Sequence, residues 1–155
     1  MSKANELLGR RINQEIWNEK RFERIPDYYT EDFISDYSPR IVRRGRDQVR
    51  AAVNSAHDTF EGFRETIRHV IANDSHVVLH FTITGRQVRD WGPVPATGKH
   101  VKYDEVVIME IRDGKACRQF GVLDTLLALQ QLGRIPDPAG IVERSLAPGD
   151  GAGAP

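Results

Sequence analysis

The chain has 155 residues, in which 22 lysines and arginines balance 22 aspartates and glutamates, and it carries one cysteine. This balance offers no excess charge for nucleic acid or an anionic membrane, so we expect neither as a partner. A single cysteine excludes an internal disulfide and a multi-cysteine metal site. No apolar run approaches the roughly 18 residues of a membrane span, and no signal-peptide pattern follows Met-Ser-Lys, so we expect a cytoplasmic location.

The N-terminal part of the chain is predicted to be mostly helical. Apolar residues recur at steps of four over residues 4–18, which predicts an amphipathic helix. A second short helix is expected to end near Pro26, because the residue before a proline disfavours helix, and a short strand is expected over residues 33–37. An apolar stripe at helical spacing predicts a core-facing helix over residues 46–59. Three tyrosines in this region are expected to pack rather than line a pocket: Tyr28, Tyr29 and Tyr37.

From Glu65 onward the apolar pattern alternates, which predicts four long strands arranged as two hairpins. The first hairpin is expected to turn at residues 73–75 and to pair Ile71 with Val77 and Ile67 with Phe81, so that odd-numbered positions face the helices. An irregular loop over residues 90–100, rich in proline and glycine, leads to the second hairpin.

The second hairpin turns at Asp113-Gly114, a dipeptide that is the strongest short-range signal for a hairpin. Beyond it, a leucine-rich helix follows Asp124 and ends at Gly133. Helices first and antiparallel strands afterwards predict an α+β domain, with the helices on one face of the sheet. We expect one domain over residues 1–140 and a disordered tail over residues 141–155.

The second hairpin gathers the candidate functional residues. Counting outward from a two-residue turn pairs Tyr103 with Asp124 and places Glu105 and Arg118 on the same face. The rest of this face is apolar, and a mostly apolar surface with a few convergent polar groups is typical of a small-molecule pocket. We expect the substrate to be held by these polar groups together with five apolar side chains: Phe81, Trp91, Val107, Met109 and Phe120.

Two of these polar residues have alternative interpretations. Asp124 precedes a helix and is a favoured N-cap residue, so it acts either as a catalytic acid/base or as a cap. Glu105 is either a second catalytic acid or the partner of Arg118 in a buried ion pair. The five histidines fall on different elements or far apart on one strand, so we expect no metal site.

Two segments, GPVPATGKHV and IMEIRDGKACRQFGVLDTLLALQQLG, resemble the SnoaL-like polyketide cyclases of the nuclear transport factor 2-like superfamily. The resemblance is strongest over residues 76–133. It implies a cone-shaped α+β barrel with a curved antiparallel sheet around a deep cavity. It also implies a homodimer or homotetramer formed through the outer face of the sheet, and a place in antibiotic biosynthesis.

The activity implied by the resemblance is a cofactor-free intramolecular aldol cyclisation of an aromatic polyketide, such as an ester. Asp124 would be the acid/base, and Tyr103 would hydrogen-bond either Asp124 or a developing oxyanion. Two other functions remain open. One is an epoxide-opening hydrolase or cyclase, in which Asp124, Glu105 and Arg118 activate water, or another isomerase that uses the same cavity. The other is a non-catalytic ligand-binding module, which is favoured if Asp124 caps its helix and points away from the cavity.

Overall fold

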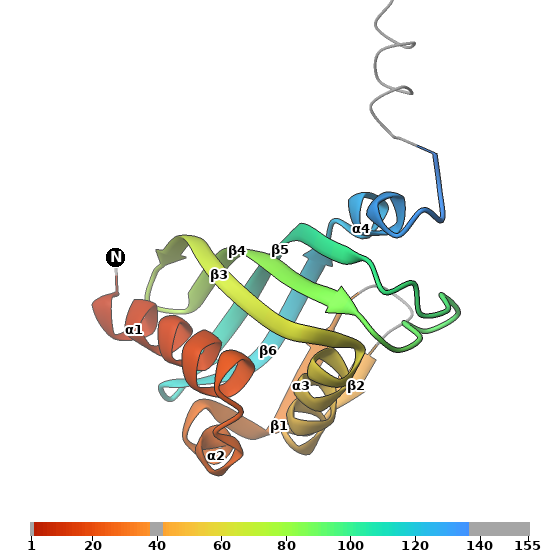
Figure 1. Ribbon diagram of the computed structural model, residues 1–155. Coiled ribbons are helices and arrows are strands. Elements are labelled where there is room, and N and C mark those ends of the chain that lie inside the picture. Colours follow the sequence, from red (N-terminus) through yellow and green to blue (C-terminus); the bar gives the residue numbers. More distant parts are fainter. Residues whose placement is uncertain (1, 38–41, 137–155) are drawn as a thin grey trace, which may run out of the picture.

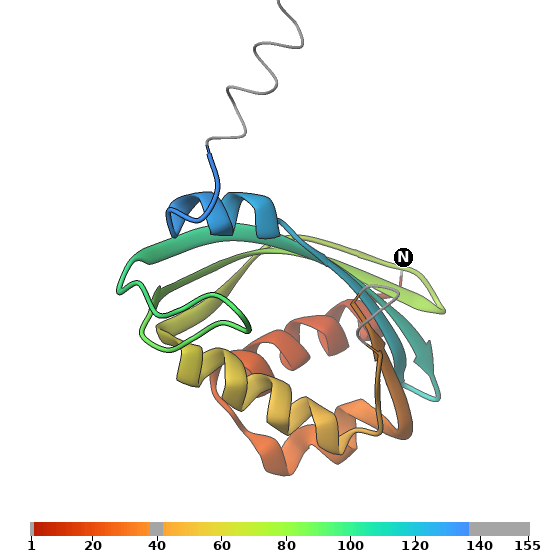
Figure 2. The ribbon, with the colours of Figure 1, turned by 90° about the vertical axis from the view of Figure 1, so that its right-hand side faces the viewer.

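A six-stranded curved sheet arches over a layer of helices in the computed structural model, which describes residues 2–37 and 42–136 (Figures 1 and 2). The strand order is β2-β1-β6-β5-β4-β3, with β1 parallel to β6 and all other neighbours antiparallel. The strands are β1 (Tyr29–Asp36), β2 (Val42–Arg44), β3 (Phe60–Ala72), β4 (His76–Gln87), β5 (His100–Arg112) and β6 (Lys115–Leu123). The predicted α+β class and the four-strand succession of hairpins are confirmed. The predicted tail, residues 141–155, lies outside the described residues.

Helices cover the concave side of the sheet and one of its ends (Figure 2). They are α1 (Lys3–Arg11), η1 (Ile12–Asn18), η2 (Phe22–Arg24), α2 (Ile25–Tyr28), α3 (Asp47–Thr59) and α4 (Thr125–Gln131). The predicted helices over residues 4–18 and 46–59 are confirmed, but the first becomes π-helical from Ile12. Pro26 lies in the first turn of α2, which begins at Ile25, instead of ending a helix, because a missing N–H in that turn costs no intrahelical hydrogen bond.

The core lies between the concave face of the sheet and α1, η1 and α3. Odd-numbered side chains of β4 supply its centre, and Val77, Leu79 and Phe81 are all at most 3% exposed. Gly9 allows α1 to approach this face closely, since a Cβ there would lie only 2.7 Å from Val77 Cγ1. Among the described residues, no helix is long and apolar enough to cross a bilayer.

The register of the first hairpin differs from the prediction on one side of a β-bulge. Ile67 pairs with Phe81 as predicted, but the register then shifts, and Ile71 pairs with Val78 instead of Val77. Between this extra residue and the hairpin turn, each β3 side chain therefore points to the side of the sheet opposite to the one predicted. Ile71 is therefore 63% exposed, although the alternation predicted it to face the helices.

A second bulge interrupts the other hairpin next to its turn. The predicted pair of Ile111 with Ala116 is present, but Glu110 then pairs with Arg118, so Cys117 is an extra residue on β6. Beyond this point, every β6 residue faces the side opposite to the one predicted, because side chains alternate with a period of two. This one-residue shift decides which side chains reach the cavity.

Candidate active site

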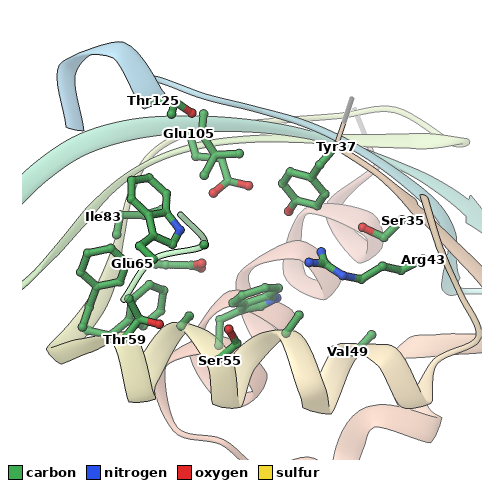
Figure 3. A pocket seen from close by; sticks show the side chains of 18 of the residues that line it. Ser35, Tyr37, Arg43, Val49, Ser55, Thr59, Glu65, Ile83, Glu105 and Thr125 are labelled. Atoms are coloured by element: carbon green, nitrogen blue, oxygen red, sulfur yellow. The ribbon is translucent and has the colours of Figure 1, made fainter. Parts of the chain in front are cut away.

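A cavity of about 590 Å³ lies between the concave face of the sheet, α3 and the loop that joins β4 to β5 (Figure 3). Its volume is in the range of pockets that hold drug-sized ligands. Aromatic rings from five different parts of the chain make up much of its wall: Trp17, Tyr29, Phe33, Tyr37, Phe60, Phe63, Trp91 and Tyr103. The surface of the cavity is therefore suited to a flat, largely apolar molecule.

Trp91 covers part of this wall from the irregular loop. Its ring lies edge-on to Phe60, with 5.5 Å between ring centroids, and stacks on Tyr103 at 6.0 Å. The loop is held in place beneath it, since Gln87 accepts hydrogen bonds from the backbone and hydroxyl of Thr97. The structure thus places two of the predicted site residues, Trp91 and Tyr103, in the cavity wall.

Glu105 points into the cavity from β5 and is only 5% exposed (Figure 3). Within the described residues its Oε1 atom has no hydrogen-bond partner. Burial raises the pKa of Glu105 from 4.5 to about 7, and interaction with the Tyr37 hydroxyl opposes this rise without cancelling it. A carboxyl group that titrates near neutrality, with one oxygen unoccupied, is equipped to take up and return a proton.

Glu65 is a second buried carboxyl group in the same cavity, and it comes from β3. Its Oε2 accepts a hydrogen bond of 2.6 Å from Asn13, and its backbone N–H and carbonyl both bond to the side chain of Asn18. Asn13 and Asn18 are five residues apart on η1, and the wide π-helical winding brings them to the same side of the helix. The local π-helix therefore fixes Glu65 in the cavity wall.

The two carboxyl groups influence each other's protonation. Burial, followed by the charge of Glu105, raises the pKa of Glu65 well above 4.5, and the hydrogen bond from Asn13 offsets this only in part. Two carboxylates in one apolar cavity do not both ionise readily, so the loss of one proton from the pair leaves the other carboxyl group protonated. The cavity thus offers a proton donor and a proton acceptor at once.

Tyrosine hydroxyls complete the polar part of the cavity. Tyr37 accepts a hydrogen bond from the side-chain amide of Gln119, and the hydroxyl of Tyr29 has no partner among the described residues. Burial raises the pKa of Tyr37 and of Tyr103 above 10, so both remain protonated donors at neutral pH. These hydroxyl groups are available to hydrogen-bond a ligand oxygen.

Three predicted site residues lie outside the cavity because of the bulge at Cys117. Arg118, Phe120 and Asp124 do not share the face of Tyr103, so the predicted common face is wrong for them. Asp124 is exposed, and its carboxylate accepts a hydrogen bond of 3.0 Å from the N–H of Leu127 as the N-cap of α4.

The predicted buried pair of Glu105 with Arg118 is absent for the same reason. The side chain of Arg118 is 57% exposed and lies 3.7 Å from the carboxylate of Asp36. The three residues proposed to activate water, Asp124, Glu105 and Arg118, are therefore not brought together. The bulge instead turns Gln119 and Leu123 into the cavity.

Three further predicted residues lie on the concave face but belong to the core. Phe81, Val107 and Met109 are at most 3% exposed, and they line a void of about 10 Å³ next to the main cavity. None of the three lines the main cavity. Their predicted contact with substrate stays a prediction.

Glu65 is the main site residue that the sequence prediction missed. A signal for it was present, because Glu65 shares the predicted inward face with the apolar Ile67 and is the one carboxylate there. Of the three tyrosines expected only to pack, Tyr28 hydrogen-bonds to Glu15 at 2.7 Å and lies outside the cavity. Tyr29 and Tyr37 line it, so the expectation is wrong for them.

Known proteins resemble this chain in sequence pattern and in fold. The family model described as SnoaL-like polyketide cyclase matches residues 8–132. The structure of TsrD from Streptomyces laurentii is 22% identical, with a TM-score of 0.78, and the match covers 87% of this chain and 99% of TsrD. A proposed SnoaL-like polyketide cyclase from Jannaschia sp. CCS1 is 20% identical over 88% and 98% of the two chains, with a TM-score of 0.78.

A third similar structure carries a different proposed activity. AclR from Streptomyces galilaeus, a proposed hydroxylase, is 23% identical, with a TM-score of 0.75, and the match covers 93% of this chain and 91% of AclR. At these identities the structures show a common fold only. No curated protein sequence matches the chain.

Proposed function

Because this chain belongs to the SnoaL-like polyketide cyclase family, we propose that it catalyses the intramolecular aldol cyclisation of an aromatic polyketide. The observation that carries the proposal is Glu105, a carboxyl group in an aromatic cavity with a pKa of about 7 and one oxygen that no described residue hydrogen-bonds. A base with this pKa is matched to proton transfer at neutral pH. The proposal moves the acid/base role from Asp124, which caps α4, to Glu105.

The first step is removal of a proton from carbon. Glu105 takes the proton from a carbon that is made acidic by an adjacent carbonyl and a conjugated ring, and the C–H electron pair becomes an enolate. Protonated Glu65 and the hydroxyl groups of Tyr37 and Tyr103 line the same cavity and are placed to donate hydrogen bonds to the enolate oxygen. Donors arranged in advance around a developing oxyanion lower the barrier most in a site of low dielectric constant.

The second step closes the ring. The enolate carbon attacks a ketone carbonyl of the same molecule, and the carbonyl oxygen becomes an alkoxide. Protonated Glu105 then returns the proton to that alkoxide, so the enzyme ends in its starting state and the product is an isomer of the substrate. Glu105 thus takes one proton from the substrate and returns one proton to it, and no oxidant or cofactor takes part.

Three variants test the assignment with an aromatic polyketide β-ketoester as substrate. Glu105→Gln removes the base but keeps the size of the side chain, and we expect turnover to fall at least about 100-fold. Asp124→Asn retains a favoured N-cap, and we expect it to stay near wild type. Glu110→Gln is the matched control, since Glu110 is exposed on the opposite face of β5.

The product mass separates the possible reactions. A cyclised product has the mass of the substrate, whereas a hydrolase product has gained one water molecule. Near-wild-type turnover in Glu105→Gln, together with a large loss in Asp124→Asn, would return the catalytic role to Asp124 and refute our assignment.

A further inference from the structure

Arg43 extends a charged side chain into the cavity from the short edge strand β2 (Figure 3). It pairs with Ser35 in the antiparallel ladder between β1 and β2, and both residues line the cavity. Its neighbours Val42 and Arg44 are not lining residues, as expected for alternating side chains. The backbone register thus directs this one cation of β2 towards the ligand space.

Arg43 forms no ion pair within residues 2–37 and 42–136. Two other arginines beside β1 do have acidic partners, since Arg112 bonds to Asp32 at 2.5 Å and Arg118 lies 3.7 Å from Asp36. The two cavity carboxyl groups, Glu65 and Glu105, are not within ion-pair distance of Arg43 either. Among these described residues its guanidinium therefore has free donors, and it lines the cavity.

We propose that Arg43 binds a carboxylate of the substrate, so that this protein acts on an aromatic acid and prefers it to the neutral ester or amide. This inference rests on the proposed function and names its substrate class. A guanidinium presents a planar fork of N–H donors that matches a carboxylate in a two-bond arrangement. The cavity also holds Glu105, which would repel an anionic ligand when it is ionised, and the positive charge of Arg43 offsets that repulsion.

The position of Arg43 also orients the ligand. Arg43 projects into the cavity from the edge strand β2, whereas Glu105 projects into it from β5, in the middle of the sheet (Figure 3). A carboxylate bound at Arg43 leaves the ring system between the aromatic walls and directs the rest of the molecule towards Glu105. A flat ligand can enter the cavity in two opposite orientations. The charge of Arg43 at one end and the carboxyl group of Glu105 at the other select the orientation in which the carboxylate of the ligand lies at Arg43.

A binding experiment tests this subsite without relying on turnover. The chain has two tryptophans, Trp17 and Trp91, and both line the cavity, so their fluorescence reports occupancy. The probes are anthraquinone-2-carboxylate and the isosteric, neutral anthraquinone-2-carboxamide. Because Arg43 is exposed to solvent, we expect the wild type to bind the acid about 10-fold more tightly than the amide at low salt, and less so at high salt.

Variants of β2 identify the source of the preference. Arg43→Met should weaken binding of the acid about 10-fold and leave the amide within about twofold, whereas Arg43→Lys should retain part of the preference. Arg44→Met is the matched control, because Arg44 lies on the same strand but does not line the cavity, and it should bind both probes as the wild type does.

The outcomes separate this inference from the proposed function. Equal affinity of the wild type for acid and amide, no binding of the acid, or equal weakening of both probes by Arg43→Met would overturn the carboxylate subsite. A preference for the acid that Arg43→Met abolishes supports the subsite, even if Glu105→Gln leaves turnover unchanged and the proposed aldol chemistry fails.

Discussion

Replacing Glu105 with glutamine is expected to stabilise the protein above neutral pH and to have little effect in acid. Burial raises the pKa of Glu105 from 4.5 to about 7, so between these values the folded protein keeps a proton that the unfolded chain releases. The stability contributed by this proton is fully present below pH 4.5 and is lost as the pH rises through about 7. Above about pH 7, the folded protein holds the ionised carboxylate of Glu105 in a buried position. The difference between the two pKa values corresponds to about 3 kcal/mol, at roughly 1.36 kcal/mol for each pH unit.

Urea unfolding at several pH values between about 4 and 8.5 measures this effect. The difference in unfolding free energy between Glu105→Gln and the wild type should grow by about 3 kcal/mol in favour of the variant as the pH rises. Glu110→Gln, an exposed change on the other face of β5, should show no such growth. A difference between Glu105→Gln and the wild type that is the same at every pH would refute the reasoning.

Three other changes have defined outcomes. Gly121→Ala should cost about 1–3 kcal/mol, because an added Cβ would collide with the ring of Tyr37, and thermal unfolding that matches the wild type would contradict this packing. Asp124→Ala should cost about 1 kcal/mol by removing the cap of α4, whereas Asp124→Asn should cost much less, and equal losses by urea unfolding would contradict the cap. We propose that a second copy of the chain covers the exposed outer face around Phe120 and Val122. Phe120→Glu should then yield monomers in sedimentation velocity, and a monomeric wild type would contradict the proposal.

The sequence predicted the elements well because their signals are local. The helix over residues 46–59 follows from its apolar stripe, and the hairpin at Asp113-Gly114 follows from a dipeptide that favours its turn. Glu105 and Tyr103 were placed on the concave face correctly, since β5 keeps its alternation from end to end.

The candidate site was predicted only in part, because a β-bulge leaves no clear mark in a single sequence. One extra residue at Cys117 moves Asp124 from the predicted pocket face to the outside and turns Gln119 inward. Glu65 was missed for a different reason. Its position depends on Asn13, which contacts it from the π-helical part of the first helix, and the periodicity of apolar residues does not reveal that winding.

The pH dependence of kcat/KM for cyclisation tests the central claim that Glu105 is the catalytic base. With Glu105 ionised in the active form, kcat/KM should rise with pH through about 7 and then level off, since burial places the pKa of this carboxyl there. Glu105→Gln should abolish that rise along with most of the activity. A rate that is flat between about pH 5 and 9, or a wild-type profile retained in Glu105→Gln, would contradict the account.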